Sequence, residues 1–171
     1  RRDNMGTYDQ FSVHLDPNLD GLTGYNFRVS AANVQGDLYF YNDDKMDQAW
    51  NAVWSSAVNV DELGWTAEIR IPLSQIRYQA SEDEQTWGIN FHRLRIASNE
   101  RSYYSLFSRT RRGIVSQMGR LDQVRVSRPS RRLELLPYGV SSVKNGPATP
   151  GDPFFDGTVS GSRFGVDMSY G

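Results

Sequence analysis

The chain is 171 residues long, carries a formal net charge of −1 and contains no cysteine. This length suits one hydrophobic core, or one domain with an appendage. The lack of cysteine excludes disulfides, thiolate metal sites and a cysteine nucleophile. No run of about 18 consecutive apolar residues is present, which excludes a membrane-spanning helix. The chain starts at Arg1 without a methionine or a signal peptide, so we expect a mature or excised fragment.

Aromatic residues make up 12% of the chain and are interrupted by 15 glycines and 7 prolines, which favours an all-β fold. Residues 1–92 carry 14 acidic and 6 basic side chains, whereas residues 93–132 carry 11 arginines and only two acids. We expect acidic and basic strands to pair within one sheet. A nucleic-acid surface would need arginines gathered on one face with stacking aromatics, so no nucleic-acid partner is expected. An anionic polysaccharide or a lipopolysaccharide headgroup is an intermediate alternative, because arginine matches carboxylate and phosphate.

The first third of the chain predicts a hairpin followed by shorter elements. Apolar and polar residues alternate over residues 8–15 and 25–30, on either side of the polar turn 16–21. Trp50 and Trp54 lie four residues apart, a spacing typical of a helical turn. Further short strands are predicted at residues 37–41 and 57–60.

Residues 64–73 are the most regular stretch of the chain. One face of the predicted strand is polar, with Thr66, Glu68 and Arg70, and the other is apolar, with Trp65, Ala67, Ile69 and Ile71. Pro72 closes the strand, because proline has no amide proton for the next rung of the ladder. We therefore predict a central strand of an antiparallel β-sandwich, followed by one short helical turn at residues 74–78.

The rest of the first 130 residues predicts more strands. Residues 87–96 read as a long strand whose apolar face changes sides after Phe91, which indicates a bulge or burial on both faces. A further strand is predicted at residues 102–107, and the closing edge at residues 118–126.

The composition changes at Pro129. A Gly/Pro/Ser-rich run extends to about residue 161, and apolar residues then alternate with small or polar ones over residues 163–170. That alternation is typical of a transmembrane barrel strand. We therefore predict an antiparallel β-sandwich over residues 1–130, and a linker with the first strands of a β-barrel over residues 131–171.

Several segments together resemble a known family, the family 9 carbohydrate-binding modules placed ahead of a bacterial outer-membrane barrel of uncharacterised function. The segments that occur in the order of that group are Trp50 and Trp54, residues 64–78, Trp87 to Phe91, Arg93, Glu100 and residues 133–138. Similar residues of the group also match Asp9, Asp16, Asp20, Phe27 and Asp37. The resemblance covers about residues 1–140. It implies a β-sandwich in the periplasm or outer membrane of a Gram-negative bacterial cell envelope that binds sugar without catalysis, with its opening strands missing before Arg1.

Residues 16–21, Asp-Pro-Asn-Leu-Asp-Gly, match the first half of a calcium-binding loop. Asp16, Asn18 and Asp20 would place their oxygens around one cation, and Gly21 permits the sharp turn. The twelfth position, where a bidentate glutamate belongs, is Phe27, so a full EF-hand is absent. A plain polar hairpin loop is the alternative interpretation. Calcium is the one cofactor that the sequence suggests.

Partly exposed aromatic side chains beside polar neighbours are candidates for stacking on a sugar ring. The candidates are Tyr39, Tyr41, Trp50, Tyr103 and Tyr104. Trp54, Trp65 and Trp87 lie on apolar faces and are predicted to be core residues. For Trp50, a core role and a ligand-binding role both remain open.

Catalysis has little support in the sequence. Glycoside hydrolysis needs two carboxyl groups about 5–10 Å apart. Glu68 could be one of them, but no second carboxyl is identifiable, and a salt bridge with a neighbouring arginine explains Glu68 equally well. His14 and His92 have no hydrolase motif around them. We therefore expect non-catalytic carbohydrate binding; the alternatives are a structural or plug-like periplasmic domain without a sugar ligand and, last, a glycoside hydrolase.

Overall fold

The computed structural model describes residues 2–108, 110–126, 133–146 and 157–170. The fold is all-β with antiparallel pairing, which confirms the class predicted from the sequence. The chain divides into two compact units, Arg1–Ser130 and Arg131–Gly171. The strands are β1 (Gln10–Asp16), β2 (Gly24–Ser30), β3 (Gln35–Tyr41), β4 (Lys45–Asp47), β5 (Ser55–Asp61), β6 (Gly64–Arg70), β7 (Gln85–Arg95), β8 (Glu100–Tyr103), β9 (Gly119–Val124), β10 (Leu133–Asn145) and β11 (Thr158–Tyr170).

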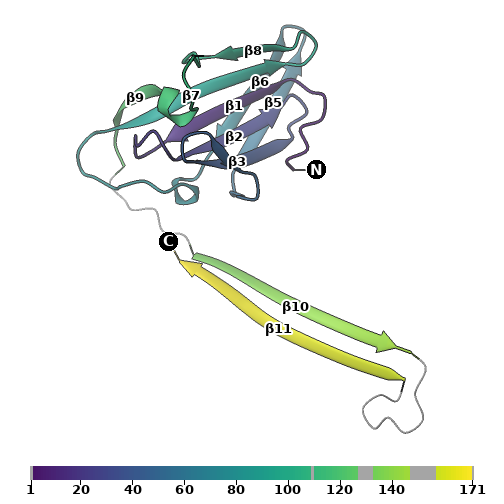
Figure 1. Cartoon of the computed structure of the whole chain (residues 1–171). Coiled ribbons are helices and arrows are strands. Elements are labelled where there is room, and N and C mark those ends of the chain that lie inside the picture. The colour runs from purple at the N-terminus through teal and green to yellow at the C-terminus, as the bar shows by residue number, and fades with distance from the viewer. Residues whose placement is uncertain (1, 109, 127–132, 147–156, 171) are drawn as a thin grey trace. The chain divides into compact units, whose positions relative to one another are not determined.

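The first unit is built on one main sheet with the strand order β4-β3-β2-β1-β7-β8, and β9 also pairs with β7 (Figure 1). β1 lies inside this sheet, because it pairs with β2 on one side and with β7 on the other. Two short 3₁₀ turns, η1 (Leu73–Gln75) and η2 (Val115–Gln117), complete the regular structure of this unit. The expected bulge in β7 lies at its start, between Gln85 and Trp87, rather than after Phe91.

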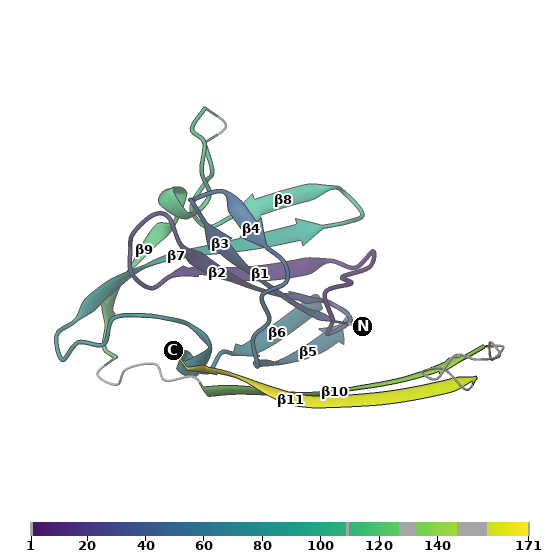
Figure 2. The ribbon, with the colours of Figure 1, turned by 60° about the horizontal axis from the view of Figure 1, so that its bottom comes forward.

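The β5–β6 hairpin forms a second, two-stranded sheet on one side of the main sheet (Figures 1 and 2). The core between them includes the buried rings of Phe27 and Trp87, with Trp65 and Ile69 of β6 packed against them. Other buried members of this core are Leu15, Tyr25, Val29, Ala52, Trp54, Ile76 and Val126. Burial of aromatic and branched side chains is the main stabilising term for this unit.

The predicted position of residues 64–73 is wrong, although the predicted faces are right. β6 alternates between half-buried and exposed residues as expected. However, its strand partner is its hairpin neighbour β5, so it is not a central strand. The interior strand β2 alternates between apolar and polar residues in the same way, yet it is buried at nearly every position, so alternation does not reveal whether a strand is central.

The helical turn predicted from the spacing of Trp50 and Trp54 is also wrong, because these residues lie outside any helix. Both indole rings instead contact Phe27 edge-on, at centroid distances of 5.8 and 5.6 Å. The four-residue spacing of the two tryptophans therefore reflects their packing on the Phe27 ring rather than helical geometry. The 3₁₀ turn η1 follows the strand as expected, but it begins one residue earlier.

A buried carboxylate joins three segments of the first unit. Asp37 of β3 accepts hydrogen bonds from the guanidinium of Arg2, with a shortest contact of 2.6 Å, and from the backbone N–H of Ala52. Arg2 also donates to the carbonyl oxygen of Ala52. The N-terminal segment and the chain before β5 are thus both fixed to the main sheet.

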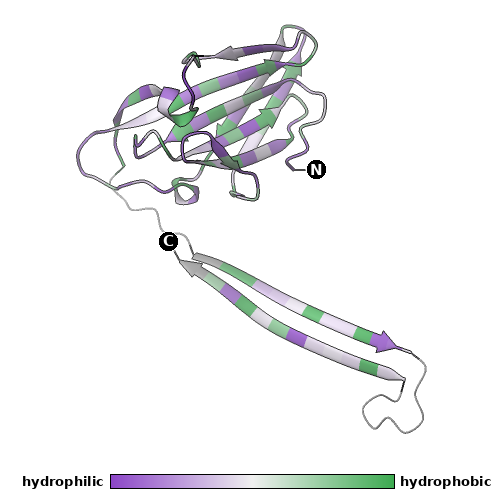
Figure 3. Ribbon diagram, viewed as in Figure 1, coloured by the Kyte–Doolittle hydropathy of each residue, from purple (hydrophilic) through white to green (hydrophobic). Residues whose placement is uncertain are grey.

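The second unit is a long hairpin in which β10 and β11 pair without a register shift. Polar and hydrophobic residues are interspersed along both strands (Figure 3). Across the ladder, the ring of Phe164 covers Gly139, and Tyr138 covers Gly165 on the opposite face. None of the helical segments in the described ranges has the length and apolar character of a bilayer-spanning helix.

Candidate functional site

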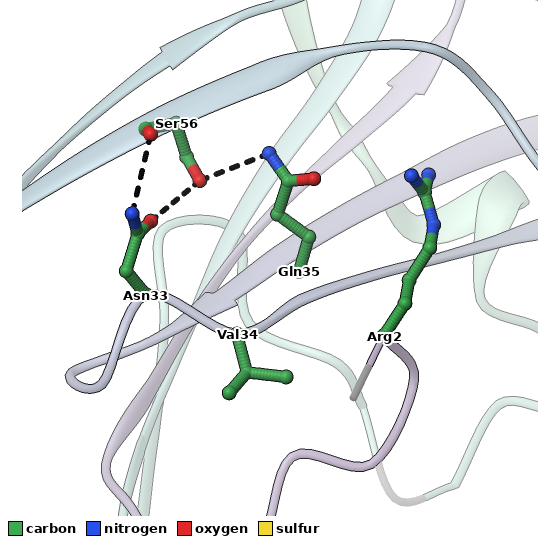
Figure 4. A pocket seen from close by; sticks show the side chains of 5 residues that line it. All are labelled: Arg2, Asn33, Val34, Gln35 and Ser56. Atoms are coloured by element: carbon green, nitrogen blue, oxygen red, sulfur yellow. Dashed lines mark hydrogen bonds between the residues drawn. The ribbon is translucent and has the colours of Figure 1, made fainter.

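A shallow polar pocket of about 380 Å³ lies where the β2–β3 turn meets β5 (Figure 4). It is lined by Arg2, Asn33, Val34, Gln35 and Ser56. Its polar groups bind one another: the Ser56 hydroxyl donates to Asn33 at 2.7 Å, and the Gln35 amide donates to Ser56 at 3.1 Å. Arg2 is held by Asp37. We therefore assign this pocket to the seam between the two sheets and not to a ligand site.

A second group of polar side chains lies on the main-sheet face opposite the β5–β6 hairpin. Cross-strand partners share a face of a sheet, and Ser12 pairs with Arg28 on β2 and with His92 on β7. His14 pairs with Asn26 in the same way. We call this set the histidine face, and it consists of Ser12, His14, Asn26, Arg28, His92 and Tyr103.

The histidine face contains four buried polar atoms without a hydrogen-bond partner among the described residues. These atoms are His14 Nδ1, Asn26 Oδ1, Arg28 Nε and His92 Nε2. Only two other side-chain atoms in the described part of the chain share this condition. Because buried polar groups are nearly always hydrogen-bonded, such a concentration makes this face the candidate site of the first unit.

Aromatic rings surround these polar atoms. Tyr103 stacks on His92 with a centroid distance of 4.7 Å and an interplanar angle of 10°. Phe107, from the segment after β8, lies 4.7 Å from the ring of Tyr103 and 6.5 Å from that of His14. Phe40 of β3 approaches His14 from the other side, at 5.5 Å. The face thus combines flat apolar surfaces with hydrogen-bonding groups.

Both imidazoles of the histidine face are neutral at pH 7. Burial, together with the nearby His92, whose ring centroid is 6.4 Å away, lowers the pKa of His14 to about 4. Burial also lowers the pKa of His92, and the charge of Arg101 acts in the same direction. A neutral imidazole offers one N–H donor and one acceptor nitrogen, so each ring can either donate a hydrogen bond to a hydroxyl oxygen or accept one from a hydroxyl hydrogen.

The segment that carries Phe107 is fixed at two points. The side chain of Gln117 accepts the N–H of Ser108 at 2.8 Å and donates to the carbonyl oxygen of Gly113 at 2.7 Å. The carboxylate of Asp43, on the β3–β4 turn, accepts the backbone N–H groups of Ile114 and Ser116 at 2.9 and 3.0 Å. The segment after Phe107 is thereby fixed by Gln117, which is part of η2, and by Asp43, which binds η2 and the residue before it.

Of the five aromatic residues predicted to bind sugar, the structure places only Tyr103 on the histidine face. Tyr39 and Trp50 pack against Tyr25 beside the hairpin-facing core, at 5.3 and 5.2 Å. Tyr41 is exposed at the end of β3. Tyr104 is also exposed and contacts Phe91, on the other side of the sheet from Tyr103.

The predicted calcium loop uses its carboxylates internally. Asp16 is buried and accepts the N–H groups of Asp20 and Gly21 at 3.3 and 2.9 Å. Asp20 accepts two further N–H groups and the hydroxyl of Thr23. No group of three His, Cys, Asp or Glu side chains gathers as a metal site within the described ranges. Calcium binding by Asp16, Asn18 and Asp20 stays a prediction.

Glu68, the candidate hydrolase carboxyl, is exposed on β6 opposite Ala57. It forms no ion pair within the residues that the structure describes, so the expected arginine partner is not seen.

The histidine face was missed in the sequence because its two histidines belong to no motif. The sequence signal that could have revealed this face is the set of polar residues in two alternating strands. These residues are Ser12 and His14 in one strand and Asn90 and His92 in the other. Those positions are normally solvent-facing. Only the strand order, which joins β1 to β7, brings the two histidines together. Comparisons of the chain with family models, with curated proteins and with solved structures find no match.

Proposed function

We propose that the first unit is a non-catalytic carbohydrate-binding domain whose ligand contacts the histidine face. The observation that carries this proposal is the set of four buried polar atoms without partners, beside the rings of Tyr103 and Phe107. Sugar hydroxyls both donate and accept hydrogen bonds, as do neutral imidazoles and the amide of Asn26. The apolar side of a sugar ring complements an aromatic surface.

The fold and location belong to the same proposal. We infer a β-sandwich in which the β5–β6 hairpin is the second layer, since its apolar side chains share one core with the main sheet. The alternating strands of the second unit support a role as the first strands of an outer-membrane β-barrel. Such a barrel would place the chain in the bacterial cell envelope.

The proposal is tested by calorimetric titration of the whole chain with ligands chosen from a glycan array. We expect Tyr103→Ala and Phe107→Ala each to weaken binding about 10-fold, which corresponds to about 1.4 kcal/mol. Tyr104→Ala is the matched control, because this neighbouring tyrosine faces away from the site, and it should bind like the wild type.

Two results would overturn this assignment. If no glycan binds, the chain is better explained as a structural, plug-like domain. If glycans bind but neither Tyr103→Ala nor Phe107→Ala changes the affinity, the histidine face is not the site.

A further inference from the structure

The histidine face carries positive charge without a matching carboxylate. Arg28 lies on this face, and Arg101 pairs with Leu94, two residues beyond His92 on the same side of β7. The charge of Arg101 also contributes to the lowered pKa of His92. Asp16, which follows His14 on the same side of β1, binds its own loop, and Asp43 binds the η2 segment.

Within the described residues, neither Arg28 nor Arg101 takes part in an ion pair. Arg101 is exposed, whereas Arg28 is half-buried and its Nε atom is buried without a hydrogen-bond partner among those residues. An arginine that is partly buried without an anion loses hydration and gains nothing in exchange. A bound carboxylate would offset this loss through two parallel hydrogen bonds.

The sequence makes room for Arg28 to lie across the sheet. Its side chain passes over Gly36 of the neighbouring strand, where a Cβ would lie 2.7 Å from Nε and 3.2 Å from Cγ. A side chain at position 36 would therefore displace the guanidinium. Arg28 thus has two cross-strand neighbours, Gly36 on β3 and Ser12 on β1, and its side chain lies over the glycine.

We propose that the ligand is an oligosaccharide of acidic sugars, an oligouronate, in which the carboxylate of one sugar is bound by Arg28 while the ring of another sugar lies against Tyr103. Arg101 adds a second positive charge at the edge of the site. This inference rests on the proposed carbohydrate-binding function. It narrows the ligand to sugars that carry a negative charge.

The test compares trigalacturonate with its methyl ester, which has the same sugar rings but no charge. Calorimetric titration of the whole wild-type chain at low salt should give about 10-fold tighter binding of the acid, or about 1.4 kcal/mol. Arg28→Gln should abolish this preference. Arg125→Gln removes the same charge from an exposed pair with Glu84 and should keep the preference.

Gly36→Ala gives a second, independent variant because it displaces the guanidinium without changing the net charge, and it should also reduce the preference. Equal affinity for acid and ester in the wild type would overturn the uronate inference while leaving carbohydrate binding intact. A preference that survives in both Arg28→Gln and Gly36→Ala would likewise overturn it. If trigalacturonate, its ester and the neutral glycans all fail to bind, the proposed function itself fails.

Discussion

His14 links the stability of the first unit to pH through a single side chain. Its pKa is about 4 in the folded chain and near the ordinary 6.5 when the chain is unfolded. Between these values the unfolded chain binds a proton that the folded chain does not, so the contribution of His14 is complete above pH 6.5 and is lost as the pH falls toward 4. The full loss amounts to about 3 kcal/mol.

We therefore expect urea unfolding, followed by tryptophan fluorescence, to show lower stability at pH 4 than at pH 7. His14→Gln should flatten this dependence, since the substitution removes the titrating group. An unchanged difference between the two pH values in His14→Gln would show that other groups cause it.

At the scale of single residues, the sequence predicted which side chains are buried better than which ones lie on the histidine face. The alternation over residues 64–71 correctly separated the core side chains of β6 from the exposed ones. Tyr103 and Tyr104 could not be distinguished, because both have polar neighbours and only the pairing of Tyr103 with His92 places one of them on the histidine face. Arg28 gave no signal, since its environment is made by Gly36 from another strand.

At the scale of elements, the contact between the β3–β4 turn and η2 depends on Asp43. Burial tends to raise the pKa of its carboxyl, but hydrogen bonds from the backbone and hydroxyl of Ser116 and from the N–H groups of Ile114 and Val115 outweigh burial and lower it. Gly113 is required beside it, because its φ of +105° is strained for other residues and a Cβ there would collide with the Asp43 carboxylate.

Asp43→Ala should free this contact and let the Phe107 segment open more often. The measurement is amide hydrogen exchange, in which Ile114 and Ser116 should exchange faster than in the wild type. The wild type should behave like the variant only at acid pH, because the stabilising effect of Asp43 is present above its unfolded pKa and is lost as the pH falls through its lowered folded pKa. Asp44→Ala is the control, since the exposed carboxylate of this neighbour forms a single ion pair within the described residues, with Lys45 at 3.7 Å. Equal exchange in both variants would contradict the role of Asp43.

The elements themselves were largely predictable, and their neighbours were not. Period-two alternation located most strands because each has one apolar side, as in β1 and β2. The four-residue spacing of Trp50 and Trp54 led to a wrong prediction of a helical turn, because packing of both rings on Phe27 can produce the same spacing as a helix. The position of β6 in the smaller sheet was missed because alternation reports burial and carries no information about partners.

At the scale of the molecule, Asp37 holds the two sheets of the first unit and its N-terminal segment together. The carboxylate is fully buried, and removing it leaves the N–H of Ala52 and the guanidinium of Arg2 without their acceptor. We expect Asp37→Ala to lower the free energy of unfolding by about 3 kcal/mol. All four tryptophans lie in this unit, so their fluorescence reports its unfolding alone.

Asp122→Ala provides the comparison for Asp37→Ala. It removes a carboxylate that is 63% exposed and 3.6 Å from Arg120, and such surface pairs contribute little. Its effect should stay within about 0.5 kcal/mol. Similar losses in the two variants would show that Asp37 acts through general charge rather than as the acceptor that joins the segments.

The interior position of β1 also constrains how the chain is synthesised. β1 can form its ladder with β2 as soon as Ser30 has left the ribosome, but its other edge must wait for β7, where Val13 meets Phe91. Closing so long a loop is slow, and an unpaired edge attracts other strands. During translation the nascent hairpin of β1 and β2 therefore keeps an unpaired edge until Arg95, the last residue of β7, has emerged.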